Sequence, residues 1–226
     1  MRLNRLLFGS SLALFAAFPA VAAERVAQIP PPALDNPLAA GAPQTIVLAG
    51  GCYWGMQAVF EHIKGVQQVI AGFTGPRRSS QDDGIISRGH VPAESVQITF
   101  DPGKISYGQI LQIYFSVAHD PTQLNKQGPD EGPQYRSDIF YADDSQEKIA
   151  EAYIAQLGAA HVYPSDIVTS VDRLTDFRAV PDSQQDYVRK NPTLLYVTSI
   201  DLPKLAALKI LFPNRYLDPP LTVSGS

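Results

Sequence analysis

The sequence is poor in the residues that make cross-links and metal centres. Its 226 residues contain one cysteine, one tryptophan and two methionines. A single cysteine excludes an intramolecular disulfide, and the four histidines show no metal-ligand spacing, so we expect no zinc site. A phosphate-binding glycine loop and the G-x-S-x-G turn of hydrolases are also absent from the sequence. These absences argue against a zinc enzyme, an enzyme with a phosphate-binding glycine loop and a hydrolase with a G-x-S-x-G turn.

Positive charge is scarce as well. The chain has 18 basic and 22 acidic residues, a formal net charge of −4, and no basic run. Nucleic acids are bound mainly through clustered basic side chains, so we expect no nucleic-acid partner. Hydrophobic residues make up 45% and charged residues 18% of the chain, which is typical of a globular protein with a substantial core.

The first residues have the layout of a secretory signal peptide. Arg2 and Arg5 precede the apolar run "LLFGSSLALFAAF", and the small residues "AVAA" follow it. This order predicts a signal peptide over residues 1–23 and an exported, periplasmic protein. An uncleaved anchor is the rival, but the apolar run is short for a spanning helix and no later stretch could span a bilayer. Removing two arginines would leave 16 basic against 22 acidic residues, a charge of −6.

The composition divides the remainder into three parts. Residues 24–44 are dominated by proline, alanine and glycine without an apolar period, which predicts an extended tether with little order of its own. Residues 45–215 show regular apolar patterns and are expected to form one domain, which we expect to be monomeric. Residues 216–226 are expected to be a flexible tail.

The order of predicted elements indicates an α+β fold. Residues 45–50, 66–75, 94–102 and 136–142 have the β-branched or alternating pattern of strands. Residues 52–65 and 106–120 have helical spacing. The order strand, helix, strand, strand, helix, strand is that of a ferredoxin-like (split βαβ) core in a two-layer sandwich. A C-terminal extension adds a strand at 166–171 and helices at 145–157, 182–191 and 202–212.

The single cysteine lies where the first strand turns into the first helix, in "LAGGCYWGMQAVF" (48–60). Two glycines before Cys52 allow a sharp turn, and the partial positive charge of a helix N-terminus favours a thiolate, so the pKa of Cys52 is expected to fall. The alternative is that Cys52 is a small buried hydrophobic residue. The glycines, the aromatic neighbours and the exported setting together favour a nucleophile.

Three neighbouring side chains are candidates for roles around that thiol. Tyr53 and Trp54 could form an apolar pocket or simply pack in the core, although a buried indole N–H needs a partner. Glu94 begins a predicted strand after a long loop (76–93). At the mouth of an apolar site its carboxyl could have a raised pKa and donate a proton, and otherwise it is a solvated charge at a strand end.

The polar run "HDPTQLNKQGPDEGPQYRS" (119–137) is either a surface excursion or a binding loop. Asp130 and Tyr135 are the residues in it best suited to place a polar ligand atom. A cysteine hydrolase that pairs Cys52 with His119 or His90 is a further hypothesis, supported only by the residue types.

Several stretches together resemble the A-type peptide methionine sulfoxide reductases. "GGCYWG" is similar to the family's G-C-F-W-G motif, with Tyr53 in place of phenylalanine. "AESVQITFDP" resembles the stretch around the family's catalytic glutamate, here Glu94. Residues 119–137 are a nearly complete match to another family run. "RKNP" and "DLPKLAALKILFP" resemble the C-terminal part, so that the similarity covers about residues 45–213.

The resemblance implies the following chemistry. Cys52 as a thiolate would attack the sulfur of a methionine S-sulfoxide, free or in an oxidised protein, and protonated Glu94 would give its proton to the oxygen. Methionine would leave, with Cys52 as a sulfenic acid. Tyr135 and Asp130 would hold the sulfoxide oxygen, and Tyr53 and Trp54 would enclose the methyl group. No cofactor is implied, only an external thiol or a thioredoxin- or glutaredoxin-like reductant.

The sequence departs from the family pattern in four places. No tyrosine occurs in residues 74–93, where relatives usually have one, and "GHVPAE" is longer than the usual G-H-A-E. Gln184 stands where a histidine is common, and no second cysteine is present to form the disulfide that many relatives use. These departures leave open a catalytically weakened module that only binds oxidised methionine or a partner protein.

Overall fold

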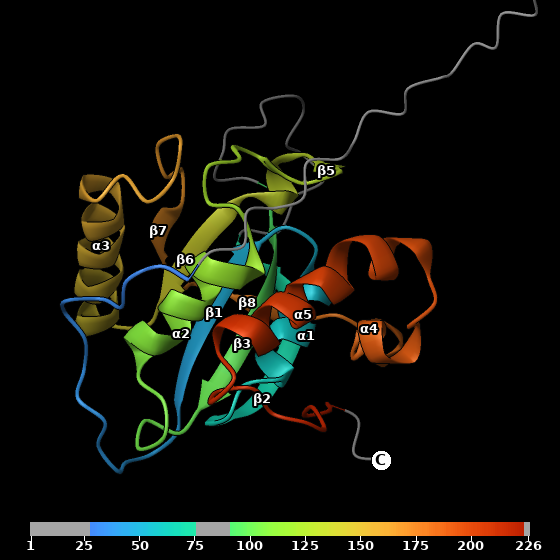
Figure 1. Ribbon diagram of the computed structural model, residues 1–226, viewed down its shortest axis with the longest axis horizontal. Helices are drawn as coiled ribbons and strands as arrows, with labels where there is room; N and C mark the ends of the chain where they lie inside the picture. Colours follow the sequence, from blue (N-terminus) through green and yellow to red (C-terminus); the bar gives the residue numbers. More distant parts are fainter. Residues whose placement is uncertain (1–27, 76–90, 224–226) are drawn as a thin grey trace, which may run out of the picture.

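The computed structural model describes residues 28–75 and 91–223. A sheet of six strands lies at its centre, with the longer helices packed around it (Figure 1). The predicted signal peptide, residues 24–27 of the predicted tether and most of the predicted loop at 76–93 lie outside the described residues. Within the described ranges no helix is long and apolar enough to cross a membrane.

The strand order in the large sheet is β7-β6-β1-β3-β2-β8. Its members are β1 (Gln44–Gly50), β2 (Val66–Thr74), β3 (Ala93–Phe100), β6 (Ser137–Tyr141), β7 (Ser170–Arg173) and β8 (Phe177–Ala179). Neighbouring strands pair antiparallel except β6 and β7, which are parallel. The four strands expected from the sequence form the central block, β6-β1-β3-β2, so the predicted mixed α and β architecture is confirmed.

The helices lie between the strands in the sequence and follow the last of them. The α-helices are α1 (Tyr53–Glu61), α2 (Tyr107–Ile113), α3 (Asp144–Ala159), α4 (Tyr187–Lys190) and α5 (Leu202–Leu211). Two π-helical turns, η1 (Tyr114–Ala118) and η4 (Val197–Asp201), adjoin α2 and α5, and two 3-10 turns are η2 (Pro133–Tyr135) and η3 (Asp182–Gln184). A small two-stranded sheet joins β4 (Lys126–Gln127) to β5 (Asp130–Glu131).

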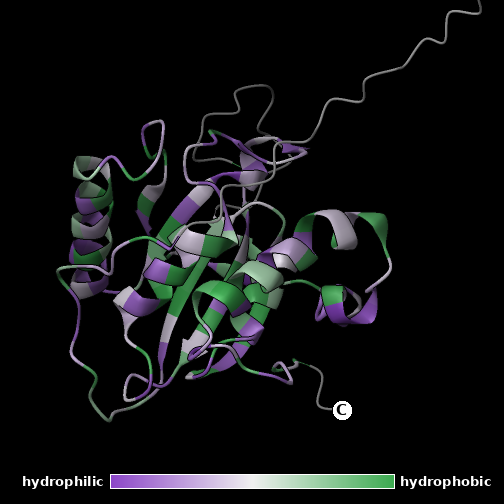
Figure 2. Cartoon of the chain, in the orientation of Figure 1, coloured by the Kyte–Doolittle hydropathy of each residue, from purple (hydrophilic) through white to green (hydrophobic). Residues whose placement is uncertain are grey.

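The alternation of side chains along β1 divides the core between two faces of the sheet. Ile46 and Leu48 join the large hydrophobic cluster under the helices, whereas Val47 and Ala49 join a smaller cluster on the other face. Figure 2 shows hydrophobic residues gathered on the central strands and the helices against them. This packing fixes β1 on both faces, and β1 leads directly into Cys52.

The C-terminal extension differs from its predicted form. The strand expected at 166–171 begins four residues later, as β7, and β8 was not expected because its three residues carry no alternation of their own. The helix expected at 182–191 is only the turn η3 and the short α4. Asp186 separates them because its backbone is left-handed, with φ 53°.

Residues 28–44 of the predicted tether (24–44) contact the domain in the structure. Ile29 is 3% exposed and lies in the main cluster, and the Tyr153 hydroxyl donates to the Pro30 carbonyl (2.6 Å). Asp35 accepts hydrogen bonds from the Ser106 hydroxyl and from the Gly108 N–H (2.8 Å), at the start of α2. A segment without secondary structure is therefore held by the hydrogen bonds of Asp35 to the start of α2 and by one buried apolar residue.

Residues 216–223 of the predicted tail contact the C-terminal end of α1 in the structure. The Tyr216 ring stacks on His62, with 5.0 Å between centroids. The N–H groups of Leu217 and Leu221 donate to the carbonyls of His62 (2.7 Å) and Glu61 (3.0 Å). These bonds satisfy carbonyls that a helix end leaves without intrahelical partners, so the tail closes the C-terminal end of α1.

Candidate active site

Cys52 lies at the junction of β1 and α1 as the N-cap residue of the helix. Gly51 before it has φ +91°, and a Cβ there would lie 2.7 Å or less from Gln127 side-chain atoms, so the turn requires glycine. The Cys52 side chain is partly exposed. The predicted placement of the thiol at the start of the first helix is thus what the structure has, apart from a helix start one residue later.

Glu94 lies beside Cys52 and Tyr53 in the structure, although it is 41 positions from Tyr53 in the sequence. The carboxylate oxygen Oε2 of Glu94 accepts the Tyr53 N–H at 3.1 Å, and its side chain also hydrogen-bonds Cys52. Burial raises the pKa of Glu94 to about 7, the charge of Asp130 adds to this, and the two hydrogen bonds oppose it. The alternative of a solvated strand-end charge is therefore wrong.

The pKa of Cys52 is raised, not lowered as expected from its place on the helix. Burial is the largest cause, and the neighbouring carboxylate of Glu94 is the next. The Trp54 N–H at the helix N-terminus opposes both, but it is weaker. Desolvation and the negative charge of Glu94 together outweigh the partial positive charge at the helix N-terminus. The local dielectric is low, and the carboxylate carries a full charge whereas the helix N-terminus carries about half of one.

Cys52 and Glu94 must be treated as one titrating pair. Each negative charge disfavours the other, so the pair holds two protons at acid pH and one at neutral pH and above. With one proton, a thiol beside a carboxylate interconverts with a thiolate beside a carboxylic acid. The second form combines a nucleophile with an adjacent acid, which is what displacement at a polar X–O bond needs.

Tyr135 and Asp130 come from the loop between α2 and β6, as predicted. Burial raises the pKa of Tyr135, and the charges of Glu94, Asp130 and Cys52 add to it, so this phenol stays protonated beside the pair. Asp130 accepts a hydrogen bond from the Tyr196 hydroxyl. A second phenol therefore reaches the site from the turn η4, and no spacing in the sequence pointed to Tyr196.

Trp54 forms an aromatic cluster with residues from the C-terminal extension. Its ring stacks on Tyr187, with 3.7 Å between centroids and 5° between planes, and meets Tyr196 edge to face at 6.0 Å. The indole N–H donates to Oε1 of Gln184 at 3.2 Å. Gln184 thus supplies the partner that a buried indole needs, while Tyr187 was not identified from the sequence because its contact with Trp54 spans 133 positions.

Tyr53 is more buried than Trp54 and lies deeper in the cluster. Its ring packs edge to face on Phe73 at 5.8 Å and on Trp54 at 6.3 Å. Phe73 pairs with Glu94 across β2 and β3, which brings the aromatic wall and the acid to adjacent positions. The ring of Tyr53 packs in the core, as the alternative expected, whereas its backbone N–H donates to Glu94 in the site.

Arg136 joins the segments that carry Glu94 and Tyr135. Its Nη1 donates to the carbonyls of Val91 (2.7 Å) and Pro133 (3.1 Å), and its Nε donates to Asp138 (3.0 Å). Val91 lies three residues before Glu94, and Pro133 starts the turn η2 that ends at Tyr135. One planar guanidinium therefore sets the separation of two site residues.

His119 does not have the surroundings of a catalytic base. Its ring nitrogens contact the Tyr114 carbonyl (3.2 Å) and the Ser137 hydroxyl (2.7 Å), and burial lowers its pKa to about 3. It fills the space beside Gly50, where an added Cβ would lie 2.9 Å from its ring. His119 is a structural residue behind the turn, and His90 lies outside the described residues.

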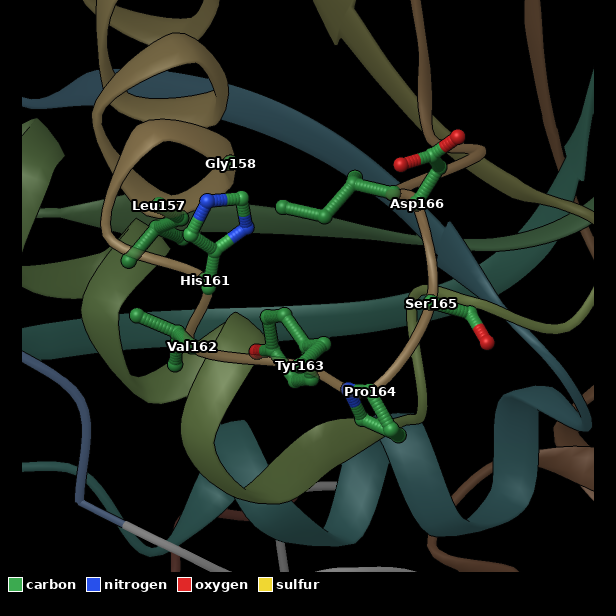
Figure 3. A pocket seen from close by; sticks show the side chains of 9 residues that line it. Leu157, Gly158, His161, Val162, Tyr163, Pro164, Ser165 and Asp166 are labelled. Atoms are coloured by element: carbon green, nitrogen blue, oxygen red, sulfur yellow. The ribbon is translucent and has the colours of Figure 1, made fainter.

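A separate pocket of about 110 Å³ lies at the C-terminal end of α3 (Figure 3), and no site residue lines it. Its wall runs from Leu157 to Ile167. Within the described residues, no group of three His, Cys, Asp or Glu side chains could hold a metal ion.

Comparison with known proteins agrees with this geometry. Residues 44–212 match the family model "Peptide methionine sulfoxide reductase". A peptide methionine sulfoxide reductase MsrA 2 from Mesorhizobium japonicum is 49% identical, over 84% of this chain and 97% of its own. One from Synechocystis is 44% identical, over 83% and 89%.

Solved structures give the same result. The reduced form of Mxr1 from Saccharomyces cerevisiae matches with a TM-score of 0.56 and 27% identity, over 67% of this chain and 87% of that one. Methionine sulfoxide reductase A of Corynebacterium diphtheriae matches with a TM-score of 0.52 and 28% identity, over 77% and 91%. The chain belongs to the peptide methionine sulfoxide reductase family.

Proposed function

We propose that this chain is a peptide methionine sulfoxide reductase that converts methionine S-sulfoxide to methionine, free or in oxidised proteins. The observation that carries the proposal is the pairing of the only thiol, Cys52, with a carboxyl of raised pKa, Glu94, beside an aromatic cluster. Family membership and the activity named for the relatives support it.

The reaction needs no proton from solvent in its first half. In the one-proton pair, the thiol proton moves to Glu94 and the sulfur of Cys52 attacks the sulfoxide sulfur. Glu94 then gives the same proton to the sulfoxide oxygen, and this oxygen moves to Cys52 as the sulfide leaves. Cys52 is oxidised by two electrons to a sulfenic acid, the substrate sulfur is reduced by two, and Glu94 ends as a carboxylate.

The surrounding residues orient the substrate. Trp54 and the ring of Tyr53 enclose the S-methyl group, and the hydroxyl of Tyr135 donates to the sulfoxide oxygen. The Tyr196 hydroxyl donates to Asp130 and holds this carboxylate in place, and Asp130 orients the sulfoxide oxygen through a water molecule, at a site whose loop carries no tyrosine in residues 74–93. An aromatic cage on one side and donors on the other select one epimer, since only one arrangement at sulfur places the methyl group in the cage and the oxygen on the donors while the sulfur faces the thiol.

The second half-reaction depends on an outside thiol. The sequence has no other cysteine, so the sulfenic acid condenses with an external thiol to a mixed disulfide and water, and a second thiol then releases Cys52. A small thiol or a thioredoxin- or glutaredoxin-like reductant fits this role, and no prosthetic group takes part.

We also propose that the chain works after export, as a monomer, with residues 1–23 as its signal peptide, and that the four central strands with α1 and α2 are a ferredoxin-like core. The charged start, apolar run and small residues support export. The order β6-β1-β3-β2 supports the core.

Single-turnover chemistry tests the activity. The reduced protein is mixed with excess blocked methionine S-sulfoxide and no reductant, and the methionine formed is counted. One equivalent per chain is expected, and none from Cys52→Ser, because a hydroxyl is neither ionised nor soft enough to attack sulfur. No release from the native protein would favour a module that binds the sulfoxide without reducing it.

A further inference from the structure

Two acidic residues meet in the protein interior at the opposite end of α1 from Cys52. Glu61 is 3% exposed and Asp186 is 1% exposed, and their side chains are hydrogen-bonded to each other. Two carboxyl groups can share a hydrogen bond only when one of them is protonated, since two carboxylates offer no donor. The pair therefore holds a proton that the reaction at Cys52 does not use.

The charges around the pair decide which carboxyl keeps the proton. Asp186 Oδ2 lies 3.4 Å from Arg189 and 3.7 Å from Lys190, both on α4, and Asp186 Oδ1 accepts the Val223 N–H at 2.9 Å. Glu61 Oε1 is buried with no hydrogen-bond partner among the described residues. Asp186 therefore carries the charge. Burial and the charge of Asp186 raise the pKa of Glu61 to about 9, and the two cations oppose this.

Asp186 is also the hinge between the two partners of Trp54. Gln184, which accepts the indole N–H, lies two residues before it, and Tyr187, which stacks on the indole, follows it. The left-handed backbone of Asp186 is held by its N–H to Oε1 of Gln57 on α1, at 3.0 Å. In Figure 1 the helices α1, α4 and α5 lie side by side around this junction.

We propose that Glu61 and Asp186 are a one-proton carboxyl pair that positions Gln184 and Tyr187 on Trp54 and so sets the shape of the substrate cage. The pair acts through these residues and touches no substrate, so both members are positioning residues. Loss of the proton places two negative charges in one buried site, and separation of Glu61 from Asp186 relieves the repulsion. Asp186 then moves, and its two neighbours leave Trp54.

Fluorescence gives a direct test, because Trp54 is the only tryptophan of the chain. In the full protein, emission is recorded between about pH 6 and pH 10.5. We expect a reversible change with a midpoint near 9 in the wild type and none in Glu61→Gln, whose amide donates to Asp186 at every pH. Glu151→Gln removes an exposed carboxylate from α3 and should behave as wild type.

A second variant separates the pair from other titrations near Trp54. In Asp186→Asn the charge beside Glu61 is gone, and asparagine tolerates the left-handed backbone, so the midpoint should fall below that of the wild type. A transition that keeps its midpoint in both variants arises from tyrosines or from Cys52 and would overturn the proposal. An emission that does not change with pH in the wild type would overturn it as well.

The consequence for catalysis rests on the proposed function. For a blocked methionine S-sulfoxide, KM should rise roughly three- to tenfold above about pH 9 in the wild type but not in Glu61→Gln, the factor expected for one lost aromatic contact. The rate constant of the bound substrate should change less. If the protein reduces no sulfoxide, the fluorescence result still decides the positioning role. If the protein reduces the sulfoxide and KM changes with pH equally in the wild type and in Glu61→Gln, the carboxyl pair does not shape the substrate cage.

Discussion

The proton shared by Cys52 and Glu94 leads to a specific pH dependence of the first turnover. Burial raises the pKa of Glu94 from 4.5 to about 7, with Asp130 adding to the effect. This difference in pKa corresponds to a free energy of about 3 kcal/mol against the carboxylate. Below about pH 7 the pair therefore holds two protons, and above it one. The one-proton form is the reactive form, because its thiol can pass a proton to Glu94.

The wild-type rate should rise about tenfold per pH unit below about pH 7 and then level off. Glu94→Gln should be slower by about 10²-fold or more at neutral pH, the usual scale for loss of a general acid. The rate of Glu94→Gln should keep rising into the alkaline range. Its thiol has no neighbouring carboxylate to accept the proton, and burial still raises the pKa of Cys52 after the charge of Glu94 is removed.

The assay is rapid-quench measurement of methionine release with no reductant, so that the ionisation of a donor thiol does not enter. A wild-type rate that falls tenfold per unit above about pH 7 would refute the reasoning, since it would mean that a neutral thiol and a protonated Glu94 are both required. A Glu94→Gln profile that levels off near pH 7 would assign the acid to another group.

The same pKa has a consequence for stability that needs no substrate. An unfolded glutamate ionises near 4.5 and the folded one near 7, so between these values the folded state holds a proton that the unfolded state has released. The contribution of Glu94 to stability is therefore lost as pH rises from about 4.5 to 7. Glu94→Gln should match the wild type at about pH 4 and be more stable by about 3 kcal/mol above about pH 7.5, measured by urea unfolding.

Three further predictions follow from other contacts. After one turnover without reductant, intact-mass spectrometry should show a gain of one oxygen on Cys52, and an unchanged mass with methionine released would contradict the sulfenic acid. Arg136→Met should lower kcat by roughly tenfold by freeing the carbonyls of Val91 and Pro133, with Arg136→Lys in between, and equal rates in all three proteins would contradict the positioning role. Asp35→Ala should cost about 1–2 kcal/mol in urea unfolding by removing the two hydrogen bonds that Asp35 accepts from Ser106 and Gly108 at the start of α2, whereas a change near zero would mean that this contact of residues 28–44 adds nothing to stability.

The sequence by itself determined the elements that are specified by local pattern. The strands around Cys52 and Glu94 have continuous or alternating apolar residues, and the first helix has large apolar side chains at helical spacing, Met56, Val59 and Phe60, so their order could be predicted. The type of chemistry at Cys52 and Glu94 followed from the motifs. Residue types and short spacings carry this information, because neighbours in sequence stay neighbours after folding.

Tertiary structure decided what depends on residues far apart in the chain. The sign of the pKa shift at Cys52 could not be predicted, because the helix N-terminus is local whereas the desolvation and the Glu94 charge arrive only on folding. Tyr187 and Tyr196 reach Trp54 only through the packing of α4 and η4 on α1. The packing of residues 28–44 on the domain could not be predicted either. This segment has no apolar periodicity, and it is held by single contacts, such as those of Ile29 and Asp35, which leave no pattern in the sequence.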